Sequence, residues 1–183
     1  MPFYEITQDF HSEAGWVLDR PSAGADYVVG NQDLQRFSQV SCHITWGTSQ
    51  AEPLAIAHPN ILVCSQALVD LLDIPGQTEL IPVDIRHPDG SWLSGHYAVY
   101  VSQQVDSIDT DKSVFERWPA DSQIGVQKLG AFKRFDQLVI DETKVQGLSI
   151  FKLQNYSALT FVDGALRAQL MSRSIRGIAF RPL

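Results

Sequence analysis

The amino-acid sequence predicts an α+β fold with mixed or antiparallel sheets and a few short helices. Hydrophobic residues make up 44% and charged residues 19% of the 183 residues, which suffices for a sizeable core. Short apolar runs recur between turn-forming residues, as in proteins built from short strands. Two segments follow a capping residue with apolar positions at helical spacing. We expect one domain over residues 1–183, with a strand-rich N-terminal part (1–58) and an α+β body (59–183).

The N-terminal part contains short strand candidates separated by turns. We predict strands over residues 3–6, 15–18, 26–29 and 40–46, and a short helix near 32–37. Proline, glycine and asparagine punctuate the sequence between these strands, which is typical of turns.

The central segment predicts a strand, a helix and a further strand in succession. Residues 61–64 form an apolar run, Ser65 stands at the N-cap position, and the helix spacing continues to Leu72. Residues 80–86 then alternate between polar and apolar types. Because proline has no N–H to donate to a sheet, Pro82 indicates an edge strand or a bulge.

A hairpin is predicted directly after this strand. The sequence 87–90, His-Pro-Asp-Gly, has proline and glycine at the second and fourth positions, as β-turns prefer. Strand-like residues return at 92–93 and 97–101.

The C-terminal segment repeats the order of the central one. Residues 159–162 predict a strand, Asp163 an N-cap, 165–170 a helix and 178–180 a final strand. An offset of 98 residues aligns Ser65 with Asp163 and superposes the two strand–cap–helix–strand units. This alignment indicates either a pseudo-repeat or the coincidence of a common local pattern.

Charge is distributed unevenly along the chain, whose formal net charge is −7. Residues 1–111 contain 15 acidic and 3 basic side chains, a net charge of −12, whereas residues 112–183 contain 6 acidic and 11 basic side chains, a net charge of +5. An acidic chain repels phosphate backbones, so we expect no nucleic-acid partner. The acidity either steers a basic protein partner or only aids solubility.

The sequence predicts neither membrane insertion nor export. Its apolar runs are far shorter than the ~18 residues of a spanning helix. The first residues lack the basic and apolar stretches typical of a signal peptide. We therefore expect cytoplasmic localisation and no membrane partner.

Catalytic and cofactor motifs are absent from the sequence. It contains no G-x-S-x-G nucleophile elbow, no glycine-rich phosphate loop and no H-E-x-x-H string. The five histidines are scattered singly, and Cys42 and Cys64 belong to no C-x-x-C pair. We expect no catalytic residues, no metal and no cofactor, and we interpret both cysteines as small core residues.

Two sets of side chains are candidates for partner binding. The densest acidic cluster consists of Asp106, Asp109, Asp111 and Glu116. Its D-x-x-D-x-D spacing does not match a calcium loop, so we interpret it as a solvated loop or a protein-binding surface. The second set is Trp92 with Asp89 of the neighbouring turn, where an exposed tryptophan would be an interface anchor.

The C-terminal half carries a distinctive pattern of apolar residues. It comprises a strand over 149–153, an apolar run into a cap over 159–163, helix positions Leu166 and Leu170, and the ending G-x-x-F-x-P over 177–182. This pattern resembles bacterial immunity protein family eleven over residues 59–183, with a looser fit over 1–58. The resemblance implies a protein encoded beside a secreted toxin that it binds and neutralises, and it brings no catalytic residues.

We therefore expect a non-enzymatic protein that occludes a cognate toxin through the two candidate sets of side chains. An acidic surface would occupy the basic groove of a nucleic-acid-cleaving toxin as a phosphate mimic. The alternative is a small hydrolase or transferase that assembles His43, Asp84 and His96 from distant segments. A third interpretation is a self-associating structural module, for which a homo-oligomer is expected.

Overall fold

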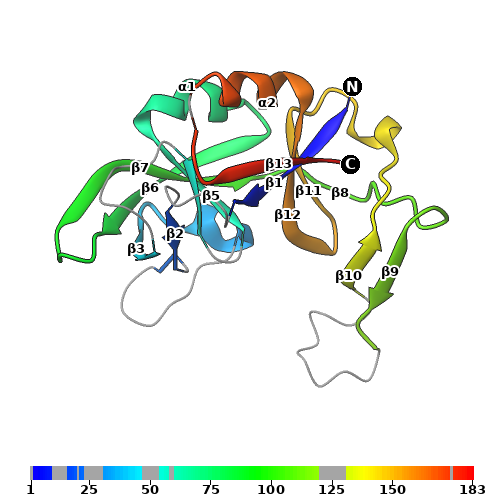
Figure 1. The fold of residues 1–183 in the computed structure, drawn as a ribbon, viewed down its shortest axis with the longest axis horizontal. Helices are drawn as coiled ribbons and strands as arrows, with labels where there is room; N and C mark the ends of the chain where they lie inside the picture. Colours follow the sequence, from blue (N-terminus) through cyan, green and yellow to red (C-terminus); the bar gives the residue numbers. More distant parts are fainter. Residues whose placement is uncertain are drawn as a thin grey trace.

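A computed structural model describes residues 2–9, 16–19, 21–22, 31–46, 54–57, 60–119, 131–173 and 175–183. Within these residues the strands form a closed barrel, a five-stranded sheet and a two-stranded arm, and two short α-helices pack side by side over the barrel and the sheet (Figure 1). The predicted α+β fold with mixed and antiparallel sheets is confirmed. The strand predicted at 26–29 lies outside the described residues.

Six strands close into the barrel in the order β2-β3-β6-β7-β5-β4, with β4 pairing back to β2. They are β2 (Val17–Leu18), β3 (Val40–Trp46), β4 (Leu54–Ala57), β5 (Ile61–Ser65), β6 (Thr78–Arg86) and β7 (Trp92–Val101). The β2–β4 and β3–β6 pairs are parallel, and the other pairs are antiparallel. Alternate residues of these strands point inward and fill the barrel with apolar side chains, which explains the alternation in the sequence.

The five-stranded sheet has the order β13-β1-β12-β11-β8. Its strands are β1 (Phe3–Gln8), β8 (Gln104–Val105), β11 (Ile150–Leu153), β12 (Tyr156–Asp163) and β13 (Ile178–Pro182). The arm consists of β9 (Val114–Arg117) and β10 (Phe132–Gln137), which pair with each other. In the described residues, 3-10 helices lie at Asn31–Arg36, Gln66–Leu68 and Glu142–Val145, and the first confirms the short helix predicted near 32–37.

Three apolar clusters hold these parts together. The first fills the barrel, where Trp16 is 1% exposed. The second lies between the barrel wall, one face of the five-stranded sheet and the two helices, which contribute Leu72 and Leu170. The third lies on the opposite face of the sheet, where Phe151 and Phe161 pack with residues of the arm. Burial of apolar surface therefore joins both halves of the chain through the middle cluster.

The two strand–helix–strand units aligned in the sequence share one topology. Helix α1 (Val69–Leu72) connects β5 to β6, which pair on either side of β7. Helix α2 (Gly164–Met171) connects β12 to β13, which pair on either side of β1. The Asp163 carboxylate caps α2 by accepting from the Leu166 N–H at 2.7 Å, as predicted.

Ser65 stands at the N-cap position of the 3-10 turn Gln66–Leu68, as predicted, but its side chain makes no capping hydrogen bond. The chain first forms a 3-10 turn after Ser65, and the α-helix begins only at Val69. β6 pairs with both β3 and β7, so it is not an edge strand as a whole, but at Pro82 the described pairing is with β7 alone. Pairing to β3 starts at Val83, directly after the proline, and a register shift follows before Ile85. The proline therefore stands beside a bulge, where its missing N–H is tolerated.

Candidate functional site

The two predicted sets of partner-binding residues lie at opposite ends of the molecule. The β6–β7 hairpin forms the left extreme of Figure 1, and the arm forms the right extreme. The hairpin-end surface is defined here by His43, Arg86, His87, Asp89 and Trp92. The arm cluster is defined by Asp106, Asp109, Asp111 and Glu116. The structure therefore does not bring the two sets of residues together.

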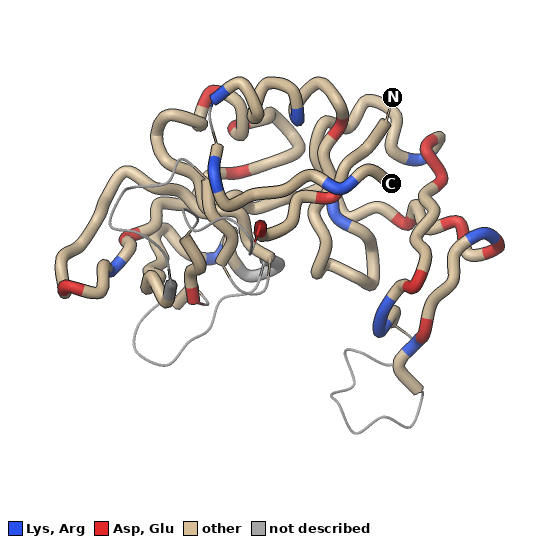
Figure 2. Tube along the Cα trace, viewed as in Figure 1, with Lys and Arg blue, Asp and Glu red and all other residues tan. Residues whose placement is uncertain are grey.

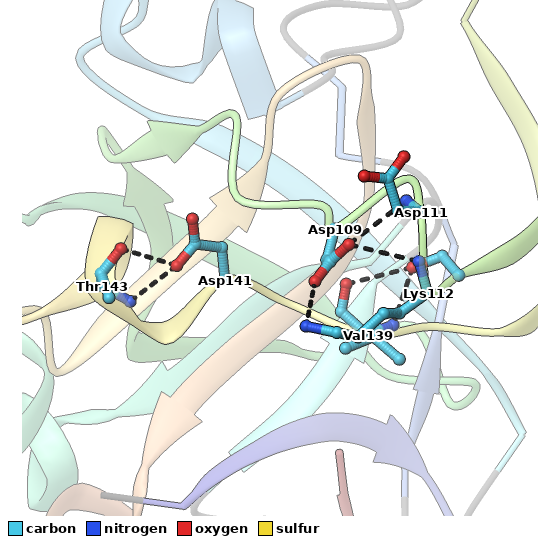
Figure 3. Close-up of polar contacts among 7 residues, drawn as sticks. Asp109, Asp111, Lys112, Val139, Asp141 and Thr143 are labelled. Atoms are coloured by element: carbon cyan, nitrogen blue, oxygen red, sulfur yellow. Dashed lines mark hydrogen bonds and ion pairs between the residues drawn. The ribbon is translucent and has the colours of Figure 1, made fainter.

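In the arm cluster, Asp109 is committed to its own loop (Figure 3). The Lys112 Nζ donates to the Asp109 carboxylate at 2.8 Å, and the backbone N–H groups of Asp111 and Lys112 donate to it at 3.2 Å. The hydrogen bond from Lys112 is the main reason that the pKa of Asp109 lies below its usual value. This carboxylate fixes the turn that leads into the arm.

Glu116 lies on β9 between two basic side chains of β10. Lys133 Nζ is 2.7 Å and Arg134 Nε is 3.2 Å from its carboxylate oxygens. The hydrogen bond from Lys133 lowers the pKa of Glu116. One carboxylate therefore faces two cations, so Glu116 adds no net negative charge to this end of the molecule.

Asp106 and Asp111 are exposed residues of the same region. Lys144 approaches the first of them and donates through Nζ to its backbone carbonyl at 2.9 Å. Nearby, Asp141 accepts hydrogen bonds from the N–H and hydroxyl groups of Thr143, which closes another turn (Figure 3). Acidic and basic residues are interspersed throughout this end of the chain (Figure 2).

The hairpin-end surface rests on a tight turn. The Gly90 N–H donates to the His87 carbonyl at 2.9 Å, and glycine suits this position because its φ is +89°. The Asp89 carboxylate accepts from the Ser91 hydroxyl at 2.6 Å and N–H at 2.8 Å, and the hydroxyl bond is the main cause of the lowered pKa of Asp89. The predicted turn is confirmed, and Asp89 serves to shape it.

Three side chains form a row across the strands beside this turn. His43 on β3 pairs with Arg86 on β6, and Arg86 pairs with Trp92 on β7. The adjacent residues Cys42 and Ile85 point into the barrel, so the row lies on its outer face. The Arg86 guanidinium carbon is 5.8 Å from the centre of the Trp92 ring, and Trp92 is 56% exposed.

Two histidines flank a shallow hollow of about 220 Å³ next to the row. His43 Nδ1 lies 2.8 Å from an Asp19 carboxylate oxygen, whose partner oxygen accepts from the His43 N–H at 2.6 Å. His87 Nδ1 lies 3.2 Å from Asp89 Oδ1. Arg86 lines the same hollow. The Asp19 carboxylate therefore orients the His43 imidazole at one ring nitrogen, whereas His87 Nδ1 approaches Asp89 without forming a hydrogen bond.

The alternative catalytic set is not assembled. His96 points into the barrel, where it is 6% exposed and packs against Trp16 with 5.6 Å between ring centres. Burial lowers the pKa of His96. His43 and Asp84 lie on the outer face of the barrel wall, and Asp84 accepts from Gln39 Nε2 at 2.5 Å. The wall therefore separates His96 from the other two residues.

The two cysteine thiols and the carboxylates of a second hollow do not form a reactive site in the described residues. Cys42 and Cys64 are buried free thiols, as predicted, and burial raises the pKa of each to about 12. A second hollow, of about 360 Å³, has Asp163 and Glu142 in its lining, but the first of these carboxylates already caps α2. The described parts of the chain hold no group of three potential metal ligands and no helix able to cross a membrane.

The sequence did not indicate that Lys152 is a buried basic residue. Lys152 on β11 is 1% exposed, and its Nζ donates to the carbonyls of Asn60 and Ser157 at 3.0 Å each. Asn60 precedes the barrel strand β5, whereas Ser157 belongs to β12 of the sheet. Burial without a carboxylate lowers the pKa of Lys152 to about 7. This side chain links the barrel to the five-stranded sheet.

Arg86 and His87 were also missed, although the predicted turn beside Trp92 was the signal that could have found them. An exposed arginine–tryptophan pair on a sheet is typical of protein-binding surfaces.

Comparison with known families then places the chain. The model of the immunity protein family Imm11 matches residues 10–183, and the chain belongs to this family. The match extends over most of the N-terminal part as well as the residues that carried the resemblance. Family membership implies a toxin-neutralising role and a cognate toxin as partner. No curated protein matches the sequence.

Proposed function

We propose that this protein neutralises its cognate toxin by binding it through the hairpin-end surface and covering the toxin's functional site, without catalysing a reaction. The observation that carries the proposal is the exposure of Trp92, 56%, at the end of a hairpin and next to Arg86. Tryptophan and arginine supply much of the binding energy at protein interfaces when a partner desolvates them.

The comparison of the two ends supports the choice of surface. At the arm, Asp109 and Glu116 are already paired with basic side chains, so a basic toxin would have to compete with those pairs. At the hairpin, Trp92 and Arg86 contact each other and leave much of their surface to solvent. Binding there requires no internal ion pair to break.

Occlusion without catalysis is supported by the placement of the reactive groups. Among the described residues, both thiols are buried with raised pKa values, and His96 lies inside the barrel away from Asp84 and His43. An occluding protein must be present in at least equal amount to its target, whereas an enzyme acts on many copies. Titration of a fixed amount of the toxin encoded by the adjacent reading frame should therefore reach full inhibition at a 1:1 ratio. Full inhibition far below that ratio would overturn the non-enzymatic proposal.

The contact surface is tested by truncating its aromatic anchor. We expect Trp92→Ala to weaken binding of that toxin by at least about 30-fold, the effect of losing an interface hot spot. The matched control is Val114→Ala on the arm, where the valine is 53% exposed, and its effect should stay within about 2-fold. Folded Trp92→Ala protein that binds with unchanged affinity would contradict the assignment of this surface.

A further inference from the structure

Resting on the proposed function, we infer that the hairpin-end surface recognises an acidic side chain of the toxin, which pairs with Arg86 beside Trp92. This specifies the chemistry of the partner at the centre of the contact. It also differs from the expectation drawn from net charge, which points to a basic partner throughout.

Arg86 has no acidic acceptor among the residues that the structure describes. Within the described residues, its guanidinium contacts the Trp92 ring and forms no ion pair with a carboxylate. Arg86 is an exposed residue, and residues 1–111 contain only 3 basic side chains. An exposed arginine with free donors, set among acidic residues that it does not bind, is available for an external carboxylate.

Among the described residues, three carboxylates near the hairpin end form hydrogen bonds with groups other than Arg86. Asp19 holds the His43 ring and its backbone N–H, Asp84 accepts from Gln39, and Asp89 accepts from Ser91. These contacts restrain the acidic groups that would otherwise pair with Arg86. The same acidic groups disfavour a loosely held anion, so the fitting ligand is one that gains paired, directional hydrogen bonds with the guanidinium.

The shape of the surface also favours a carboxylate on a side chain. His43, His87 and Arg86 are among the residues that line a hollow of about 220 Å³. The centre of the Trp92 ring lies 5.8 Å from the Arg86 guanidinium carbon and 6.5 Å from the centre of the His43 ring. An aspartate or glutamate can place its carboxylate in the hollow while its methylene groups pack against Trp92.

This pairing and the acidity of the barrel act at different stages of binding. The net charge of −12 over residues 1–111, which include every barrel strand, attracts a basic toxin over a long range. A single desolvated pair at Arg86 then fixes the orientation of the docked toxin, because wrong orientations leave the guanidinium buried and unpaired.

The experiment measures binding of the toxin from the adjacent reading frame to Arg86 variants. We expect Arg86→Gln to weaken binding by at least about 30-fold and Arg86→Glu to weaken it further. Arg86→Lys should recover only part of the loss, because an ammonium group cannot form the two parallel hydrogen bonds of a guanidinium. Lys112→Gln in the arm region, where the lysine side chain is 73% exposed, is the matched control and should change affinity by less than about 2-fold.

A charge swap identifies the partner group directly. Each exposed aspartate and glutamate of the toxin is changed to arginine and tested against Arg86→Glu, and one position should restore at least about 10-fold of the lost affinity. Absence of any such position, or an unchanged affinity of Arg86→Gln, would overturn the inference. If Trp92→Ala still weakens binding in that case, the proposed function stands and only the carboxylate partner is wrong. Melting temperatures of the variants check that each is folded.

Discussion

The two ends of the molecule use their charged residues in opposite ways. At the arm, Lys112, Lys133 and Arg134 face the carboxylates that look densest in the sequence. At the hairpin, Asp89 binds the turn and Asp19 binds the His43 ring, and Arg86 has no acidic partner in the part of the chain that the structure describes. A run of acidic residues is therefore a poor guide to a negative surface, because local pairing decides which charge remains for a partner.

The same contrast extends to the halves of the chain. The barrel strands lie within the acidic residues 1–111, whereas β9 to β13 and α2 lie within the basic residues 112–183. The arm cluster stands at the border of the basic half. An electrostatic contribution to toxin binding should therefore come from the barrel.

The largest expected effect concerns Lys152, which joins the two halves. Folded protein releases the Lys152 proton near pH 7 and unfolded protein near pH 10.5, so the unfolded state binds more protons between these values. The free energy of unfolding should rise by roughly 2–5 kcal/mol from pH 7 to pH 10.5 through this group.

Lys152→Met should remove that rise, because the methionine side chain does not ionise. Urea unfolding at a series of pH values measures it, with Lys144→Met as the control at an exposed lysine. If the free energy of unfolding of Lys152→Met depends on pH as it does in the wild type, Lys152 is not the group that causes the rise.

A smaller effect on stability is expected at the two N-cap positions, Ser65 and Asp163, one in each half of the chain. Asp163→Ala should lower the free energy of unfolding by about 1 kcal/mol, because the Leu166 N–H loses its acceptor. Ser65→Ala should leave stability within about 0.3 kcal/mol, since the serine hydroxyl caps nothing. Chemical denaturation of both variants tests the difference, and equal losses would contradict the distinct helix starts.

The smallest effect is expected at the arm. Changing Asp106, Asp111 and Glu116 together to amides should alter toxin affinity by less than about 3-fold, since these residues lie outside the proposed contact and exposed ion pairs contribute little. Association rates measured at low and physiological salt should keep the wild-type dependence. A loss above about 10-fold would move the contact surface from the hairpin to the arm.

Local features of the fold were predictable because they depend on neighbouring residues. Alternation over 40–46 and 80–86, the turn at 87–90 and the cap at Asp163 all follow from side chains a few positions apart. The sequence alignment of the two strand–helix–strand units left a pseudo-repeat and a coincidence open, and the two units share one topology in the structure.

Long-range pairing could not be predicted in the same way. The position of β1 between β12 and β13 depends on contacts across nearly the entire chain. Glu116 meets Lys133 only because β9 and β10 pair. Lys152 lies in the sequence Ile-Phe-Lys-Leu, whose middle positions do not reveal that both faces of β11 are covered. Candidate residues were therefore found where a local turn exposes them. They were missed where their surroundings depend on the pairing of strands that lie far apart in the sequence.

The position of β1 has a consequence for the order of folding during synthesis. This strand is translated well before both of its neighbours, β12 and β13, so the sheet cannot close until the ribosome has delivered them. The barrel strands occupy a continuous stretch, Val17 to Val101, and can associate earlier. A nascent chain therefore displays the proposed toxin-binding hairpin before the five-stranded sheet is complete, so we expect this contact to be available while translation is still in progress.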